Sequence, residues 1–221
     1  TNTIRELMAR KSVRVFEDRE IPADAKEAIL LSAVNAPTAG NQQLYTILDI
    51  TNQDIKEKLV DTCDHQPFIA KAPLVLVFCA DYRRWFEVFK TLDLGEELRV
   101  PAEGDFMLSV SDTLIAAHAT VVAADALGYG SCYIGDIMEN CEEQRKLLGL
   151  PAYVFPAAML VFGYPTQQQM ERAKPKRVEM QHIVHENAYR EMDAEELHDM
   201  FAYKAGQLPY EEWAKKFCDF K

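Results

Sequence analysis

The chain has 221 residues, of which 48% are hydrophobic and 27% charged, and its formal net charge is −11. These values predict one globular domain over residues 1–221 with a sizeable core, and leave room for a terminal arm. The negative charge argues against a nucleic-acid partner, because such binding needs cations that neutralise phosphates. The longest apolar run, 114–127, is interrupted by His118 and Asp125. It is too short and too polar to span a bilayer, so no membrane partner is expected.

The cysteines indicate a reducing compartment. There are five of them, an odd number, and none forms a C-x-x-C pair. A disulfide framework or a zinc site is therefore not expected. His182 and His185 have i, i+3 spacing but no matching set of cysteines or carboxylates, so no metal site is predicted there either. The N-terminus lacks the pattern of a signal peptide, and we expect a cytoplasmic protein.

Five elements are predicted in the first half of the chain. Thr3 and Glu6 form a capping-box pattern at the start of a helix. Ile29, Ala33 and Ala36 mark the buried stripe of a second helix. A continuous apolar run after Pro73 predicts a strand that is buried on both faces. The expected elements are helices at 3–10, 22–36 and 54–63 and strands at 45–50 and 74–78.

The second half adds a long helix over 106–127, stopped by Gly128. That helix is alanine-rich and apolar nearly all round, which predicts burial either centrally or against another subunit. Two capping boxes, at Asn140 with Glu143 and at Asp193 with Glu196, indicate later helices, the second of which is expected to end near Lys204. The other expected elements are strands at 131–134 and 155–162 and a last helix at 210–217. Together they predict an α+β fold with a sheet of about four or five strands covered by helices.

The acidic segment 93–104 is open to two interpretations, an exposed lid or a surface loop.

Cationic side chains gather at two places in this acidic chain. Arg10, Ser12 and Arg14 alternate, so in extended chain all three side chains point one way and form a clamp for a phosphate group. About twenty residues later, 36–43 reads as a helix end followed by a polar, amide-rich loop, which suits hydrogen bonding to a flat heterocycle. A second basic cluster runs from Arg172 to Arg177. Either cluster taken alone could also be solvated surface charge.

These motifs, in this order, resemble the nitroreductase family, and in particular its larger NADPH-dependent nitro/flavin reductase subgroup. The resemblance extends nearly end to end and is weakest after residue 190, which implies a variable C-terminal arm over 190–221. The motifs that carry it are Arg10-x-Ser12-x-Arg14-x-Phe16, Pro37-Thr38 through Asn41-x-Gln43, Gln66 fifteen residues before Asp81, Gly130-Ser131-Cys132-Tyr133-Ile134-Gly135, and Gly163-Tyr164-Pro165 followed by Lys174-Pro175-Lys176-Arg177 and His185-Glu186-Asn187.

The resemblance implies a nitroreductase-like mixed sheet in an interlocked homodimer with two FMN sites, each made from both subunits. Carried over by position, Arg10 and Ser12 would hold the phosphate, assisted by Lys174 and by Lys176 or Arg177. The other positions would surround the ring. Arg14 would lie near N1 and O2, and Gln66 at the pyrimidine end. Tyr133 would lie in the strand along the flavin edge, and the backbone N–H groups of Ile134 and Gly135 would point toward N5 and O4. The loop residues Pro37, Thr38 and Asn41 would complete the site, with Thr38 and Asn41 approaching from the partner chain.

The activity implied is a ping-pong oxidoreductase that takes hydride from NADPH or NADH and reduces a small acceptor such as a nitroaromatic, a quinone or a flavin. The flavin carries the chemistry, so no catalytic side chain is expected, and Arg14 would tune the cofactor. Alternatives with the same fold are a flavin-binding or sensing protein with little turnover, a reductive dehalogenase and an oxygen-dependent flavin enzyme. Over 201–210 the chain offers only Lys204 where the subgroup has arginines for NADPH, so NADH and NADPH both stay open.

One residue departs from the resemblance close to the expected site. Many members of the subgroup have glycine after Tyr-Ile-Gly, and this chain has Asp136. Asp136 either caps the turn that follows or places a carboxylate near the cleft, where it would disfavour anionic acceptors.

Overall fold

A computed structural model describes residues 2–92, 98–202, 212 and 215. The chain divides into two compact units, Thr1–Arg172 and Ala173–Lys221, and each is described by itself. The expectation of a single domain with a variable arm from residue 190 stays a prediction.

The N-terminal unit is built on a four-stranded sheet. The strands are β1 (Tyr45–Asp49), β2 (Leu74–Asp81), β3 (Gly130–Ile134) and β4 (Val154–Gly163), in the order β1-β2-β4-β3. All four lie where the sequence predicts strands. Each neighbouring pair is antiparallel, and parallel pairing enters the described part of the chain only through an isolated bridge between Ser12 and Ser131. The predicted α+β fold is confirmed with four strands.

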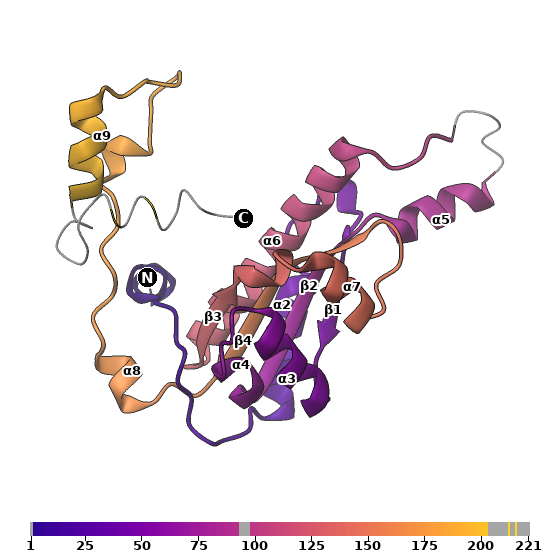
Figure 1. Ribbon diagram of the computed structural model, residues 1–221, viewed down its shortest axis with the longest axis horizontal. Helices are drawn as coiled ribbons and strands as arrows, with labels where there is room; N and C mark the ends of the chain where they lie inside the picture. The colour runs from indigo at the N-terminus through magenta and orange to yellow at the C-terminus, as the bar shows by residue number, and fades with distance from the viewer. Residues whose placement is uncertain (1, 93–97, 203–211, 213–214, 216–221) are drawn as a thin grey trace. The chain divides into compact units, whose positions relative to one another are not determined.

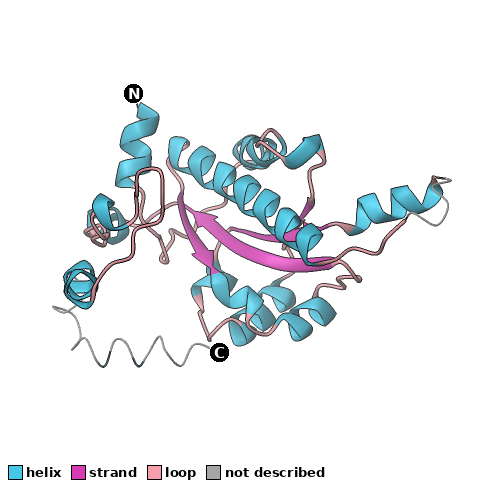
Figure 2. Ribbon diagram, turned by 90° about the horizontal axis from the view of Figure 1, so that it is seen from above, coloured by secondary structure: helices cyan, strands magenta, loops and turns pink. Residues whose placement is uncertain are grey.

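Both faces of the sheet are covered by helices (Figures 1 and 2). β2 shows why, because every one of its residues is buried and successive side chains point to opposite faces. Leu74, Leu76 and Phe78 pack in one core, and Val75 and Val77 pack in the other. A strand buried on both sides has no polar face, which is why the sequence at this strand reads as a continuous apolar run.

The first core lies under α2 (Ala23–Val34) and α6 (Glu103–Ala126). The predicted stripe of Ile29, Ala33 and Ala36 is buried in it, as expected. By length and composition alone, α6 passes as a membrane span among the described residues. It packs against α2 and the strands of the sheet, as the core helix of a globular protein does. The predicted stop at Gly128 is confirmed by its left-handed φ of 84°, a conformation that glycine adopts readily.

The second core lies under α3 (Gln53–Thr62), α4 (Phe68–Lys71) and α7 (Cys141–Leu147), which Figure 1 shows together in front of the sheet. The remaining elements of this unit connect these layers or extend beyond them. They are α1 (Asn2–Ala9), α5 (Arg83–Thr91), α8 (Gln167–Glu171) and the 3-10 helices η1 (Ala39–Asn41) and η3 (Gly135–Met138).

The described part of the C-terminal unit contains η4 (Met180–His182) and α9 (Ala194–Phe201). The capping box predicted at Asp193 and Glu196 is present in full, with each side chain accepting from the backbone of the other residue. The predicted end of this helix near residue 204 lies outside the described residues, as does nearly all of the predicted helix at 210–217.

The other two predicted capping boxes are wrong. α1 begins at Asn2, so Thr3 lies inside the first turn and is not its cap. Asn140 does precede α7, but its side chain makes no capping hydrogen bond. Its amide instead donates to the Thr62 carbonyl over 2.9 Å, so it ties α7 to the end of α3. In both cases the local pattern was correct for a helix start, and at Asn140 the neighbouring α3 determines the partner of the side chain.

Candidate functional site

The segment that carries Arg10, Ser12 and Arg14 runs along the free edge of β3. Ser12 forms a parallel bridge with Ser131, and the Val13 N–H donates to the Ser131 carbonyl over 2.8 Å. Gly130 makes this close approach possible, because a Cβ at that position would lie 2.6 Å from a methyl carbon of Val13. The backbone thus fixes the segment, and its polar side chains are left for other partners.

Those side chains gather around Cys132 on β3. Burial raises the pKa of the Cys132 thiol, and Arg14, Ser12 and Arg10 act in the opposite direction, which places all three close to the sulfur. The Nη1 atom of Arg10 is buried and has no hydrogen-bond partner. A buried guanidinium nitrogen without a hydrogen-bond partner costs free energy, so this position favours a further acceptor such as an anion.

Two other cations hold the segment in place. The Nζ atom of Lys11 donates to the Met170 carbonyl over 2.6 Å, and Arg172 donates to the carbonyl of Ser12. The backbone N–H of Arg14 donates to the Gln169 side chain over 3.3 Å. Lys11 and Arg172, which the sequence counts among its clustered cations, therefore have structural partners.

A cavity of about 220 Å³ adjoins Arg10. Glu6, Lys11 and Asp125 contribute to its lining. Burial raises the pKa of Asp125 to about 6, against the opposing effect of Arg10. The Asp125 carboxyl is thus poorly solvated in its charged form, and it lies near the guanidinium that has an unpaired nitrogen.

The residues after Cys132 follow the same strand edge and the turn beyond it. The Tyr133 ring packs against the first core, and burial raises the pKa of its hydroxyl to about 12, which keeps it protonated. Gly135 begins η3, where a backbone N–H has no partner within its own helix. A Cβ at Gly135 would meet nothing within 4 Å, so there is open space beside this N–H group.

Gln66 and Asp136 contact each other across this turn. The Gln66 Nε2 atom donates to the Asp136 carboxylate over 2.7 Å and to the Cys63 carbonyl over 3.0 Å. Within the described residues, no hydrogen bond from the Asp136 side chain caps η3. The capping interpretation of Asp136 is therefore wrong. The carboxylate is half-buried and accepts a hydrogen bond from Gln66, which lies seventy positions away in the sequence.

The loop with Pro37, Thr38 and Asn41 is organised by Asp112, a buried residue of α6 that the sequence analysis missed. The Asp112 carboxylate accepts from the Thr38 hydroxyl, from the Ala39 N–H over 3.0 Å and from the Leu44 N–H over 3.2 Å. The available signal was a carboxylate on the buried face of α6, since a buried carboxylate needs several donors. Asn41 is exposed at the tip of the loop, with a φ of 57°.

One chain does not bring its two predicted flavin-binding segments to the same edge. The segment 10–14 lies beside β3, whereas the loop 37–43 leads into β1 at the other end of the sheet order. The strands β2 and β4 lie between them. Three strand spacings put β1 about 14 Å from β3.

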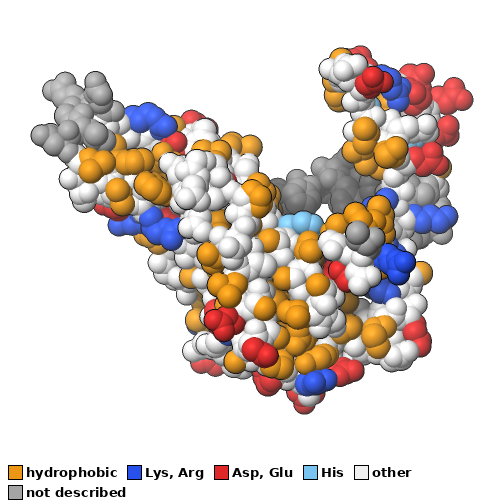
Figure 3. All heavy atoms as spheres, turned by 180° about the vertical axis from the view of Figure 1, so that it is seen from behind, with side chains coloured by type: hydrophobic (Ala, Val, Ile, Leu, Met, Phe, Trp, Pro, Cys, Tyr) orange, Lys and Arg blue, Asp and Glu red, His pale blue; other side chains and the backbone are white. Residues whose placement is uncertain are grey.

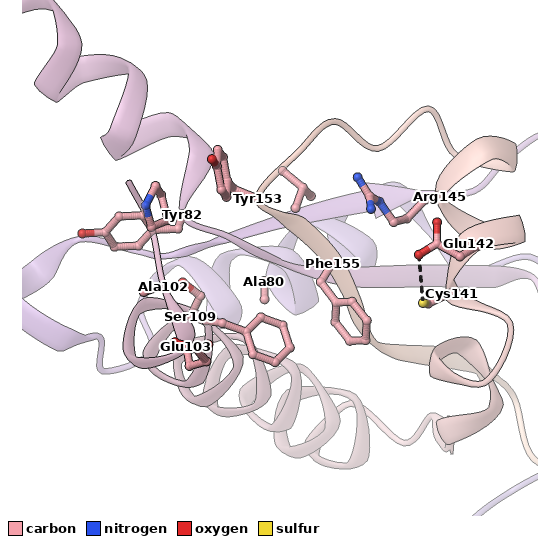
Figure 4. Close-up of a pocket in the computed structure, with 13 residues that line it drawn as sticks. Ala80, Tyr82, Ala102, Glu103, Ser109, Cys141, Glu142, Arg145, Tyr153 and Phe155 are labelled. Atoms are coloured by element: carbon pink, nitrogen blue, oxygen red, sulfur yellow. Dashed lines mark hydrogen bonds between the residues drawn. The ribbon is translucent and has the colours of Figure 1, made fainter. Parts of the chain in front are cut away.

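A separate cavity of about 530 Å³ contains none of the predicted site residues. Figure 4 shows Tyr82, Tyr153 and Phe155 around it, with Arg145 and Glu142 extending from α7 on one side. The Nε atom of Arg145 is buried without a partner. Aromatic walls beside one guanidinium suit a planar apolar group that carries a hydrogen-bond acceptor.

The predicted cations Lys174, Lys176 and Arg177 belong to the C-terminal unit. Lys176 and Arg177 line a cavity of about 570 Å³ there, together with acidic residues that include Glu196 and Asp199. Their predicted approach to Arg10 and Ser12 stays a prediction.

Comparison with known proteins places these features in a family. The model of the nitroreductase family matches residues 7–164. The FMN reductase (NADPH) of Bacillus subtilis is 30% identical over 204 residues, which cover 91% of this chain and 80% of that protein. The oxygen-insensitive NADPH nitroreductase of Salmonella typhimurium is 33% identical over 193 residues, which cover 86% and 76%. The solved structure of NADPH:FMN oxidoreductase from Vibrio harveyi complexed with NAD+ is 25% identical, with a TM-score of 0.86 and coverage of 100% of this chain and 93% of that one. This chain belongs to the nitroreductase family.

Proposed function

We propose that this chain is an FMN-dependent oxidoreductase that takes hydride from NADPH or NADH and reduces small, electron-poor molecules such as nitroaromatics, quinones or flavins. The names of its relatives support this activity. The observation that carries it is the buried, unpaired Nη1 atom of Arg10, fixed beside Ser12 and Arg14 at the edge of β3. An anion-binding group at this position fits the phosphate of FMN.

The phosphate end of FMN would be held by Arg10 and Ser12. Arg10 supplies N–H donors in a fixed planar fork, and Ser12 supplies a hydroxyl on the same segment. The basic segment with Lys174 and with Lys176 or Arg177 would add further positive charge.

The ring end would be met by groups that lie on or beside β3. Arg14, exposed and adjacent to Cys132, would place a positive charge where it stabilises negative charge on N1 and O2 of the ring. Gln66 would reach the pyrimidine end, Tyr133 would line the strand edge, and the backbone N–H groups of Ile134 and Gly135 would point toward N5 and O4. The open space at Gly135 supports that placement.

The site would be completed by a second copy of this chain. The loop with Pro37, Thr38 and Asn41 lies at the β1 side of its own sheet, so the loop of a partner subunit is better placed to meet segment 10–14. An exposed apolar surface on α2 and α6 supports a homodimer. The large hydrophobic side chains that contribute to it are Leu31, Val34, Met107, Leu114 and Ile115. Figure 3 shows hydrophobic side chains gathered on the face seen from behind.

When bound, FMN would supply the redox chemistry between NAD(P)H and the acceptor. The chain's own residues bind the phosphate, orient the ring and set its electrostatics. If both substrates use the same face of the ring in turn, the mechanism would be ping-pong. The buried free thiols of Cys63, Cys79 and Cys132 support a cytoplasmic location.

Anaerobic reduction tests this proposal. Protein loaded with FMN should be yellow, bleach rapidly with NADPH or NADH, and regain its colour when a nitroaromatic, quinone or free flavin is added in a separate mixing step. A yellow protein that neither nucleotide bleaches would instead be a flavin-binding protein or an enzyme with another electron donor. Protein that retains no FMN would contradict the proposal altogether.

A further inference from the structure

The Gln66 side chain has both of its N–H donors committed. Nε2 donates to the Cys63 carbonyl over 3.0 Å and to the Asp136 carboxylate over 2.7 Å. A carbonyl and a carboxylate can only accept hydrogen bonds. The chemistry of these two partners therefore requires the NH2 group, and not Oε1, to face them, which settles the orientation of the amide.

Because both N–H donors of Gln66 are used, only its amide oxygen is left to bind another group. Within the described residues no hydrogen bond reaches its Oε1 atom, so this oxygen is what Gln66 offers to a ligand. We propose that Asp136 is a positioning residue that locks the Gln66 amide with its oxygen free, so that the site selects a ring N–H donor. If this chain binds FMN as proposed above, that donor is the imide N3–H of the pyrimidine ring.

The other groups expected at this end of the ring make an acceptor necessary. The pyrimidine edge presents an acceptor, a donor and an acceptor in sequence, namely O2, N3–H and O4. Arg14 and the backbone N–H groups of Ile134 and Gly135 can only donate. Without an oxygen from Gln66, the N3–H group would have no partner among these residues, and a buried unpaired donor weakens binding.

This role differs from that of a carboxylate acting only through its charge. A bare charge in this position would affect any anionic ligand, whatever its ring carries. A hydrogen bond to Gln66 affects only a ligand that has an N–H group to donate. Asparagine at position 136 separates the two effects, because it keeps an oxygen that can accept from Gln66 and removes the charge.

The experiment compares FMN with N3-methyl-FMN, which lacks the N–H donor, by fluorescence titration of the apoprotein. The variants are Asp136→Asn, Asp136→Ala and, as a matched charge control, Glu139→Ala, which removes an exposed carboxylate three residues later. The natural chain should bind FMN more tightly than the methylated analogue. Asp136→Asn and Glu139→Ala should keep that ratio, and Asp136→Ala should reduce it about three- to tenfold by weakening FMN binding alone, as expected for one misaligned hydrogen bond.

Circular dichroism of each variant confirms that the ratio is measured on folded protein, and a ratio of two affinities cancels any change common to both ligands. An unchanged ratio in Asp136→Ala would overturn the proposed role of Asp136 and leave FMN binding intact. An equal fall in Asp136→Asn and Asp136→Ala would assign the effect to charge and also overturn it. Failure of the natural chain to bind either compound would instead contradict the proposed function.

Discussion

The segment 10–16 and the loop 37–43 commit their polar groups in different ways. The first is fixed by its backbone along β3, and Arg10 keeps a buried nitrogen without a partner. In the second, the Thr38 hydroxyl and the backbone N–H groups of Ala39 and Leu44 point inward to Asp112, and Asn41 is exposed at the tip. The difference indicates that the first segment can bind a charged ligand, whereas the second is a loop that its own hydrogen bonds hold in shape, with Asn41 accessible at its tip.

The largest effect is expected from removing the Asp112 carboxylate, which holds the loop 37–43 in place. Asp112→Ala leaves the Thr38, Ala39 and Leu44 donors without their acceptor and should lower the free energy of unfolding by about 2–4 kcal/mol, measured by urea denaturation. Asp61→Ala is the control, since that side chain is 75% exposed, and should change stability by about 0.5 kcal/mol or less. A loss for Asp112→Ala no larger than this control would show that the loop does not depend on Asp112.

The next largest effect is expected on FMN affinity when Arg10 is removed. Arg10→Ala should weaken FMN binding about 10- to 100-fold, because it removes charge-assisted hydrogen bonds to the phosphate. Arg5→Ala removes an exposed arginine of α1 and serves as the matched control. Fluorescence titration of both apoproteins measures the difference, and equal affinities would remove Arg10 from the phosphate site.

A smaller effect is expected at the ring. Arg14→Ala should lower the reduction potential of bound FMN by about 30–60 mV, because a cation near N1 and O2 favours the reduced, more negative ring. Arg14→Lys keeps the charge and should shift the potential less. Spectroelectrochemistry on flavin-loaded protein gives the value, and an unchanged potential in Arg14→Ala would place this guanidinium elsewhere.

The smallest effect is a pH dependence at the Arg10 cavity. Burial raises the pKa of Asp125 to about 6, so the native state holds a proton that the unfolded chain loses near pH 4. Stability should therefore fall as pH rises from about 4 through about 6. Asp125→Asn should be more stable than the natural chain by about 1–2 kcal/mol at pH 8 and nearly equal to it at pH 4. Urea denaturation at the two pH values checks this, and the same difference at both would contradict it.

Much of the fold could be predicted from the sequence, because its strands and core helices follow local patterns. The continuous apolar run of β2 and the stripe of α2 reflect burial that is visible in the order of residues. The capping boxes at Thr3 and Asn140 failed because a cap depends on which partner is nearest in space. Asn140 has a carbonyl of α3 within reach, and no pattern in its own segment shows that.

At the candidate site, the grouping of Arg10, Ser12 and Arg14 could be predicted from the sequence, but the contacts between distant residues could not. Alternation alone placed Arg10, Ser12 and Arg14 on one segment, and the structure brings them together beside Cys132. The contacts of Gln66 with Asp136 and of Thr38 with Asp112 join residues about seventy positions apart. Such pairings arise from the way the helices cover the sheet, and a single sequence carries no spacing rule for them.

A heterodimer experiment tests most directly whether one site uses segment 10–14 of one chain and loop 37–43 of another. Differently tagged Arg10→Ala and Asn41→Trp chains are co-expressed, and the mixed dimer is purified and titrated at a concentration where neither mutant homodimer binds FMN. A shared site predicts one FMN per mixed dimer, because one of its two sites then contains both natural segments. A mixed dimer that binds no FMN would contradict the account.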